Sequence, residues 1–158
     1  MLAPGLRIVF CGTAAGAESA RRQAYYAHPQ NRFWRALHEA GLTPRRLAPE
    51  DYPLMPSFGL GLTDIAKHAS GMDHQLPAQA LDRAACAALA VKIEVHAPRI
   101  LAFTSLNAGR RFLGRAGAGI GPQRERIGLT AIWLLPSPSP LAVRSWDVAP
   151  WRALALEV

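Results

Sequence analysis

The chain has 158 residues, of which 50% are apolar and 18% charged, so its composition is that of a folded globular domain and excludes a disordered chain. At this length a domain buries about 68–70% of the surface that its unfolded form exposes, so a stable core requires neither disulfides nor a structural metal. The net charge of +7 leaves two explanations open: a polyanionic partner bound by arginines, or a genomic bias toward arginine.

No segment has the pattern of a membrane span or of a targeting signal. No window reaches 18 uninterrupted apolar residues, and the N-terminus lacks a charged region followed by a long apolar segment. We therefore expect a monomeric cytoplasmic protein without membrane contact, formed by one domain over residues 1–158. Cys11 and Cys86 stand in apolar runs without metal-ligand spacing, so we expect buried thiols and no metal or iron–sulfur cluster.

The first half of the chain contains one clear strand and one clear helix. Residues 6–11 (LRIVFC) form a β-branched and aromatic run that ends at Gly12, which predicts a strand. Residues 31–40 (NRFWRALHEA) carry apolar side chains at helical spacing, with Gly41 directly after them, which predicts a helix.

The second half continues the alternation of helices and strands. Residues 79–96 carry an apolar side chain every fourth position and predict a long helix closed by Pro98. Residues 99–104 and 130–135 predict strands, with a helix between them that begins near Ser105. This order indicates an α/β layer structure with a mainly parallel sheet, whose functional sites lie beyond the carboxyl ends of the strands.

Three loops have compositions that would allow contact with a flat base, and each also has a purely structural explanation. Residues 12–16 (GTAAG) let a flat ligand approach the backbone, although a tight turn has the same composition and neither GxxxxGK[ST] nor GxGxxG is present. Residues 25–34 (YYAHPQNRFW) place aromatic rings before a helix, where they could hold an unstacked base or pack in the core. Residues 135–141 (LPSPSPL) form a proline-stiffened loop that ends in a leucine, either a wedge for a base stack or a structural turn.

Together, the stretch APGLRIVFCG, the block YYAHPQNRFW and the loop PSPSPL resemble the uracil-DNA glycosylase superfamily, and most closely its mismatch-specific uracil/thymine glycosylases, from residue 3 to about residue 151. The resemblance implies a three-layer α/β/α sandwich with a four-stranded parallel sheet. It also implies a DNA repair enzyme that flips uracil, or another deaminated or mismatched base, out of DNA and hydrolyses its N-glycosidic bond without metal or organic cofactor. Flipping is required because that bond is inaccessible inside the base stack.

The first loop departs from the family motif GxNPG, whose asparagine positions the attacking water. Ala14 stands at that position here, so a carboxylate would have to orient water or stabilise the oxocarbenium-like sugar. Asp64 is the first candidate, because variants of the family without the asparagine look similar in carrying an aspartate there; it could instead cap the turn that follows. Glu18 is the second candidate, a water held by backbone or hydroxyl groups is the third possibility, and Asp147 is expected to cap the last helix.

Other positions of the substrate site also follow from the resemblance. Tyr26 matches the aromatic residue that stacks on the flipped base, whereas Asn31 either bonds the base or caps a helix. Ser137 stands where the family has a histidine or asparagine that stabilises the departing base. The small residues of the first loop would form the pocket floor, with main-chain groups that read the base edge: Gly12, Thr13, Ala14 and Gly16.

The resemblance further places four residues at the DNA. Leu141 matches the wedge that enters the duplex and follows Ser139 of the same motif, while Arg144 and Lys67 are expected to contact phosphates. A lyase reaction would need a lysine in the pocket; Lys67 is expected at the DNA surface and the other lysine lies in the long helix, which favours a monofunctional enzyme.

Two alternatives to an active glycosylase remain. The loss of both usual polar groups, at Ala14 and Ser137, would also fit a catalytically impaired protein that binds DNA damage or mismatches. A small-molecule-binding α/β domain is the second alternative, but it leaves the aromatic block and the wedge loop unexplained.

Overall fold

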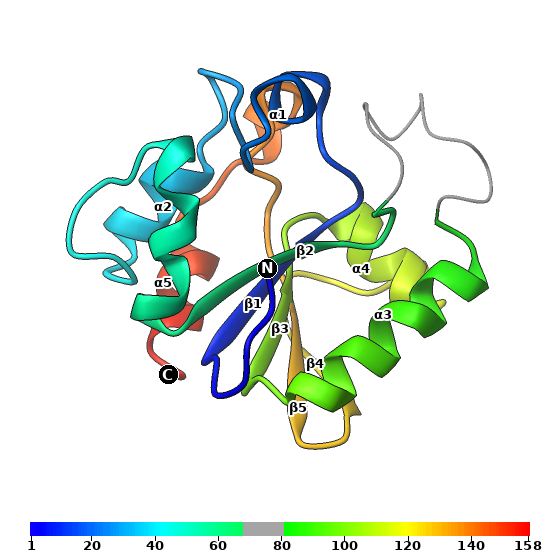
Figure 1. Cartoon of the computed structure of the whole chain (residues 1–158). Helices are drawn as coiled ribbons and strands as arrows, with labels where there is room; N and C mark the ends of the chain where they lie inside the picture. The colour runs from blue at the N-terminus through cyan, green and yellow to red at the C-terminus, as the bar shows by residue number, and fades with distance from the viewer. Residues whose placement is uncertain (68–80) are drawn as a thin grey trace.

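The computed structural model describes residues 1–67 and 81–158. A five-stranded sheet lies at the centre of this part of the chain (Figure 1). The strands lie in the order β2-β1-β3-β5-β4. Four of them are mutually parallel: β1 (Ile8–Gly12), β2 (Leu60–Asp64), β3 (Ile100–Phe103) and β5 (Thr130–Leu134). The fifth, β4 (Gly121–Ile127), pairs antiparallel with β5 and forms one edge of the sheet.

The α/β architecture and the four parallel strands confirm the prediction, whereas the antiparallel strand β4 is an addition to the expected four-stranded sheet. Its sequence, GPQRERI, contains three charged residues, and its side chains alternate between exposed and half-buried positions after Gly121. Charged side chains are typical of edge strands, because they discourage pairing with another chain. A search for apolar runs therefore misses this strand.

Helices cover both faces of the sheet. Within the described residues they are α1 (Ala17–Arg22), α2 (Phe33–Glu39), α3 (Arg83–His96), α4 (Leu106–Leu113), α5 (Ala149–Ala155), and the 3-10 segments η1 (Pro49–Phe58) and η4 (Pro140–Ser145). Helices α2 and α5 pack on one face together with η1, and α3 and α4 pack on the other (Figure 1). None of the described helices is long and apolar enough to cross a membrane.

The predicted start of α4 agrees with the observed one, whereas α3 begins later than predicted. The Ser105 hydroxyl accepts a hydrogen bond from the Ala108 N–H at 3.1 Å and caps α4. Helix α3 begins later than expected, because Asp82 caps it by accepting from the Ala85 N–H at 3.0 Å. Residues 79–80 of the predicted helix lie outside the described residues.

Strand β1 runs through the centre of the core. Ile8 and Phe10 contribute to the core on the α2 and α5 side, and Val9 and Cys11 to the core on the α3 and α4 side, as the alternation of a strand requires. All four are fully buried. Cys11 is therefore buried as predicted, whereas Cys86 is half-buried. The end of β1, which leads into the GTAAG loop, is fixed from both faces.

Candidate active site

The carboxyl ends of β1, β2 and β3 bring together four residues, Gly12, Tyr26, Asp64 and Thr104, which we call the Gly12 cluster. Gly12 and Asp64 are paired residues in the parallel register of β1 and β2. A Cβ atom added to Gly12 would lie 2.7 Å from Asp64 Oδ1. It would also lie 3.5 Å from the Tyr26 hydroxyl and 3.8 Å from Thr104 Oγ1. Three side-chain oxygen atoms therefore converge on a glycine whose lack of a side chain leaves room for them.

Tyr26 is fixed at both ends of its side chain. Its ring stacks on Phe33 with centroids 3.9 Å apart and an interplanar angle of 14°, and its hydroxyl lies 3.1 Å from Thr104 Oγ1. Its backbone is in the left-handed region with φ of 50°, which costs a bulky residue about 1–3 kcal/mol. Burial raises the pKa of the Tyr26 hydroxyl well above its ordinary value, so the phenol is neutral. The ring is thus a rigid platform with one covered face.

Asp64 carries the one ionisable carboxyl group of the Gly12 cluster. Burial raises the pKa of its carboxyl above the ordinary value of 3.8, and the positive charge of Lys67 opposes that rise. Within residues 1–67 and 81–158, no hydrogen bond is made to this carboxylate. Residues 65–67 are not helical, so the described part of the chain offers no helix for Asp64 to cap. Residues 68–69 of the predicted turn lie outside the described residues.

Glu18 and Asp147 are engaged in structural contacts. Glu18 lies in the first turn of α1, 2.6 Å from the Arg21 guanidinium, and this hydrogen bond holds the pKa of the Glu18 carboxyl below its ordinary value. Asp147 Oδ1 accepts from the N–H of Ala149, the first residue of α5, at 2.8 Å, but Val148 stands at the N-cap position, so Asp147 bonds the helix start from one residue before the expected cap. Of the three carboxylates considered, Asp64 is the one placed among converging polar groups.

Backbone hydrogen bonds from neighbouring segments hold the GTAAG loop in place. The Gly12 carbonyl accepts from the Ile65 N–H at 3.0 Å, and the Thr13 carbonyl accepts from the Ala66 N–H at 2.7 Å. The Gly16 carbonyl accepts from the Ala20 N–H at 2.9 Å at the start of α1. Ala14 is half-buried and carries no polar side-chain atom. The loop therefore provides a rigid wall of small residues, and its reading of a base edge stays a prediction.

Asn31 and Ser137 both support the backbone of their own loops. Asn31 Oδ1 accepts from the Phe33 N–H at 2.9 Å, but Arg32 stands at the N-cap position of α2, so Asn31 bonds the helix start from one residue before the cap. The Ser137 hydroxyl accepts from the Ser139 N–H at 3.2 Å. The Asn31 amide nitrogen and the Ser137 hydroxyl proton are then the groups that could still reach a base.

The expected wedge loop is η4, at the surface. Ser139 directly precedes it as its N-cap residue, and the Ser139 hydroxyl accepts from the Leu141 N–H at 3.3 Å. The Leu141 side chain is 70% exposed, and Arg144 of the same segment is exposed. Lys67 is exposed as predicted, and its ammonium donates to the Tyr25 hydroxyl at 3.4 Å. Contacts of these residues with DNA stay predictions.

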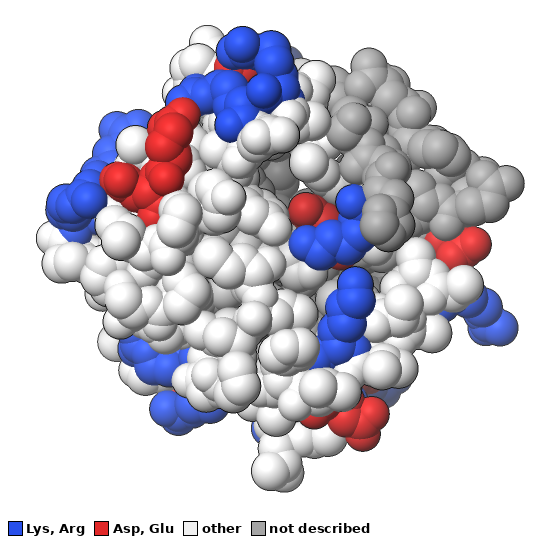
Figure 2. Space-filling model, in the orientation of Figure 1, with Lys and Arg blue, Asp and Glu red and all other residues white. Residues whose placement is uncertain are grey.

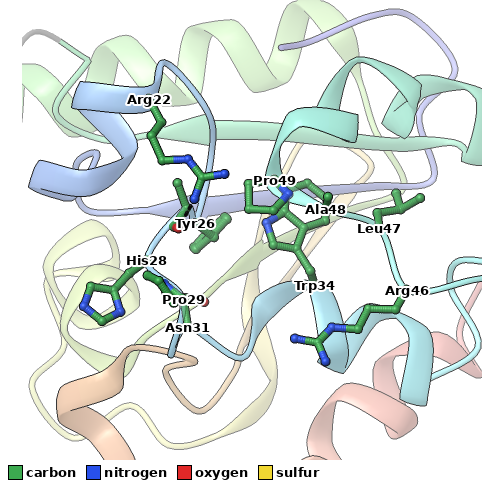
Figure 3. Close-up of a pocket in the computed structure, with 11 residues that line it drawn as sticks. Arg22, Tyr26, His28, Pro29, Asn31, Trp34, Arg46, Leu47, Ala48 and Pro49 are labelled. Carbon is green, nitrogen blue, oxygen red and sulfur yellow. Dashed lines mark hydrogen bonds between the residues drawn. The ribbon is translucent and has the colours of Figure 1, made fainter.

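A cavity of about 370 Å³ adjoins the Tyr26 loop and extends toward segment 46–49 (Figure 3). Arg22 reaches into it, donates to the Ala27 carbonyl at 3.0 Å, and pairs with Glu50. Trp34 forms another wall and donates through Nε1 to the Tyr25 carbonyl at 3.1 Å. Arg22 and Trp34 are therefore engaged in contacts within the fold.

The positive charge is divided into patches. In Figure 2, Lys and Arg side chains gather over α1, with acidic side chains beside them, and large uncharged areas separate this patch from others on the same face. Six arginines form ion pairs within the described residues: Arg21, Arg22, Arg35, Arg45, Arg115 and Arg124. Much of the arginine content thus serves surface ion pairs.

Sequence reasoning missed Thr104 as a member of this site. Its signal was its position as the last residue of the strand predicted over residues 99–104, at the end where polar residues of parallel strands meet. In the structure its N–H donates to the Cys11 carbonyl at 2.9 Å, and its hydroxyl contacts the same carbonyl at 3.3 Å. Thr104 thereby links β3 to β1 and fixes the Tyr26 hydroxyl.

A comparison of the sequence with protein families identifies one family. The sequence matches the family model of the uracil DNA glycosylase superfamily over residues 1–155. The match spans nearly the whole chain, including all three loops and every strand of the sheet. The protein therefore belongs to the uracil-DNA glycosylase superfamily, whose members are DNA glycosylases.

Proposed function

We propose that the protein is a monofunctional glycosylase that removes uracil from DNA and leaves an abasic site, with Asp64 as its catalytic carboxylate. The observation that carries the proposal is the placement of Asp64 at the carboxyl end of β2, against Gly12 and without a hydrogen bond from the described residues. We further propose that it acts as a cytoplasmic monomer on DNA that contains uracil or a mismatched base.

The Tyr26 ring would hold the flipped base. Phe33 covers one face of this ring at 3.9 Å, so a base would stack on the other face. The GTAAG loop would lie along the edge of the base, where small residues allow close approach of the backbone. The Asn31 amide nitrogen could donate to a pyrimidine carbonyl, and the Ser137 hydroxyl to the departing base.

Asp64 would act on the sugar and on water. As the N-glycosidic bond breaks, its electron pair leaves with the base, and positive charge develops on the sugar. An ionised carboxylate near that charge stabilises it, orients a water toward the anomeric carbon and accepts the proton that this water loses. This chemistry would replace the family asparagine, for which Ala14 has no polar group. Because burial raises the pKa of Asp64, base release should increase as the pH rises through that pKa.

The test measures uracil release from labelled duplex and single-stranded oligonucleotides by the wild type and by Asp64→Asn, at matched DNA occupancy. We expect a loss of at least about a hundredfold in release, with DNA affinity retained, because a positioned acid or base contributes on that scale. Glu18→Gln is the matched control: it removes the same charge from a carboxylate that is paired with Arg21, and should leave release near the wild-type rate.

Two results would contradict the proposal. Release that survives in Asp64→Asn and disappears in Glu18→Gln would transfer the role to Glu18. Tight binding of damaged DNA without release by the wild type would favour the damage-binding alternative.

A further inference from the structure

Arg32 joins the aromatic block to the loop that carries Leu141. Its backbone N–H donates to the Pro138 carbonyl at 2.9 Å. Its guanidinium donates to the carbonyl of Ser139, directly before η4, at 3.3 Å. The same guanidinium lies 5.7 Å from the centre of the Trp146 ring, directly after η4. One side chain therefore contacts both ends of the six-residue segment.

The η4 segment itself has little packing to hold it in place. None of residues 140–145 is buried, and Leu141 and Val143 are 70% and 60% exposed. The backbone of Ala142 departs from helical geometry, so the hydrogen-bonded turns of η4 are interrupted. The orientation of this segment is therefore set by contacts at its two ends, and Arg32 supplies one at each end.

Arg32 is also adjacent to the residue that supports the base platform. Phe33 is fully buried and stacks on Tyr26, and its N–H donates to Asn31 Oδ1 across Arg32. The start of α2 therefore contacts the Tyr26 ring through Phe33 and both ends of η4 through Arg32.

We propose that Arg32 is a positioning residue that holds η4 in the orientation in which Leu141 enters the duplex as a base is flipped onto Tyr26. The inference rests on the proposed function, because it takes Leu141 as the wedge. A guanidinium suits this task, since its planar fork donates to a carbonyl while its face lies over an aromatic ring. A lysine has the same charge, but it cannot make both contacts in that geometry.

The test uses a duplex with 2-aminopurine beside a central uracil, because the fluorescence of 2-aminopurine rises when its stack is opened. The variants are Arg32→Ala and Arg32→Lys in the full chain. We expect both variants to lower the ratio of opened to closed duplex by about tenfold at saturating protein. This is the scale expected when a charge-assisted hydrogen bond and a cation–π contact are lost together.

Arg35→Ala is the matched control on the same helix. Arg35 pairs with Glu39 four residues later, and its guanidinium makes no hydrogen bond or ion pair with residues 137–146, all of which the structure describes. This variant should give the wild-type fluorescence. Trp146→Leu removes the aromatic face at the other end of η4 and should reproduce part of the Arg32→Ala loss, which keeps the proposal testable if Arg32→Ala fails to fold.

The outcomes distinguish the positioning role of Arg32 from the proposed glycosylase function. Wild-type fluorescence in both Arg32→Ala and Trp146→Leu would overturn the positioning role. Full recovery in Arg32→Lys would also overturn it, because a phosphate contact needs only the charge. A wild type that opens the stack without releasing uracil would contradict the proposed function and leave the Arg32 comparison intact, whereas a wild type that opens no stack would overturn the role of Arg32.

Discussion

The Gly12 cluster and the η4 segment differ in how the fold holds them. The cluster lies at the ends of three parallel strands, where the register fixes the backbone of Gly12 and Asp64, and a stacked ring and hydrogen bonds hold the side chains of Tyr26 and Thr104. The η4 segment is a surface loop without a buried residue, held by a few contacts at its ends. One region has its geometry fixed before DNA arrives, and the other exposes an apolar side chain.

Under the proposed function, this difference suits the two regions to different steps. Bond cleavage requires reacting groups to be placed with sub-ångström precision, which strands supply. Entry into a base stack requires an exposed apolar side chain that is released from the core, which a loop supplies. Substitutions in the Gly12 cluster should therefore affect the rate of cleavage, whereas substitutions in η4 should affect the use of duplex DNA.

The largest effect that would test this division is expected from Gly12→Ala. The new methyl group would lie 2.7 Å from Asp64 Oδ1, closer than Cβ atoms approach other atoms, so the carboxylate has to move. Gly12 is not in the left-handed region, so its backbone accepts alanine. A displacement of about 1 Å can cost about a hundredfold in rate, and we expect a loss of that order in single-turnover uracil release with DNA affinity retained.

Gly117→Ala is the control, since no heavy atom lies within 4 Å of its Cβ position. It should keep the wild-type rate and melting temperature. An unchanged rate in Gly12→Ala would show that the position of Asp64 does not limit the reaction, and would break the link between the rigid cluster and the chemistry.

A smaller effect is expected from Leu141→Ala. Because Leu141 is 70% exposed, its truncation should leave the melting temperature unchanged. It should weaken uracil release from duplex DNA by about tenfold, since burial of an apolar side chain in a base stack contributes on the order of 1.5 kcal/mol. Release from single-stranded DNA, where no stack has to be opened, should change little.

Leu129→Ala provides the comparison for that measurement. Leu129 is 89% exposed in the turn between β4 and β5, away from the candidate site, so its truncation should affect neither substrate. Equal losses on duplex and single-stranded DNA in Leu141→Ala would contradict the wedge role.

The sequence predicted elements better than contacts between elements. The strands over residues 6–11, 99–104 and 130–135 were recognisable because buried parallel strands are continuous apolar runs. Strand β4 was not recognisable, because it is charged and forms an edge. The convergence of Gly12 and Asp64 could be anticipated from the meeting of strand ends, and the register of β1 and β2 makes them a pair.

The contacts that were missed join distant parts of the chain. Tyr26 and Thr104 are 78 residues apart, and Arg32 and Ser139 are 107 residues apart. Both pairs depend on how the sheet and α2 are placed in three dimensions, which no local pattern encodes. The family resemblance marked Tyr26 and Ser139 one by one, but it did not show which side chains hold them.

The smallest effect concerns stability, and it tests whether the Gly12 cluster is arranged for chemistry at the expense of folding. Because burial raises the pKa of Asp64, the folded protein retains a proton on this carboxyl at pH values where the unfolded chain has lost it. The free energy of unfolding therefore falls as the pH rises from the unfolded-state pKa through the folded-state pKa. Asp64→Asn has no such proton to lose, so at pH 7 it should be more stable than the wild type.

The expected gain is about 1 kcal/mol, the scale on which burial of an imperfectly compensated polar group affects stability, and it corresponds to a rise in Tm of about 2–4 °C. Thermal unfolding of both proteins from pH 7 downward checks this prediction: the difference should shrink as the pH approaches the ordinary carboxyl pKa of 3.8, where both states of the wild type take up the proton. A variant that is less stable than the wild type at pH 7 would mean that the ionised carboxylate supports the fold. Asp64 would then be a structural residue, and the contrast between a cluster arranged for chemistry and a loop arranged for DNA would fail at its central residue.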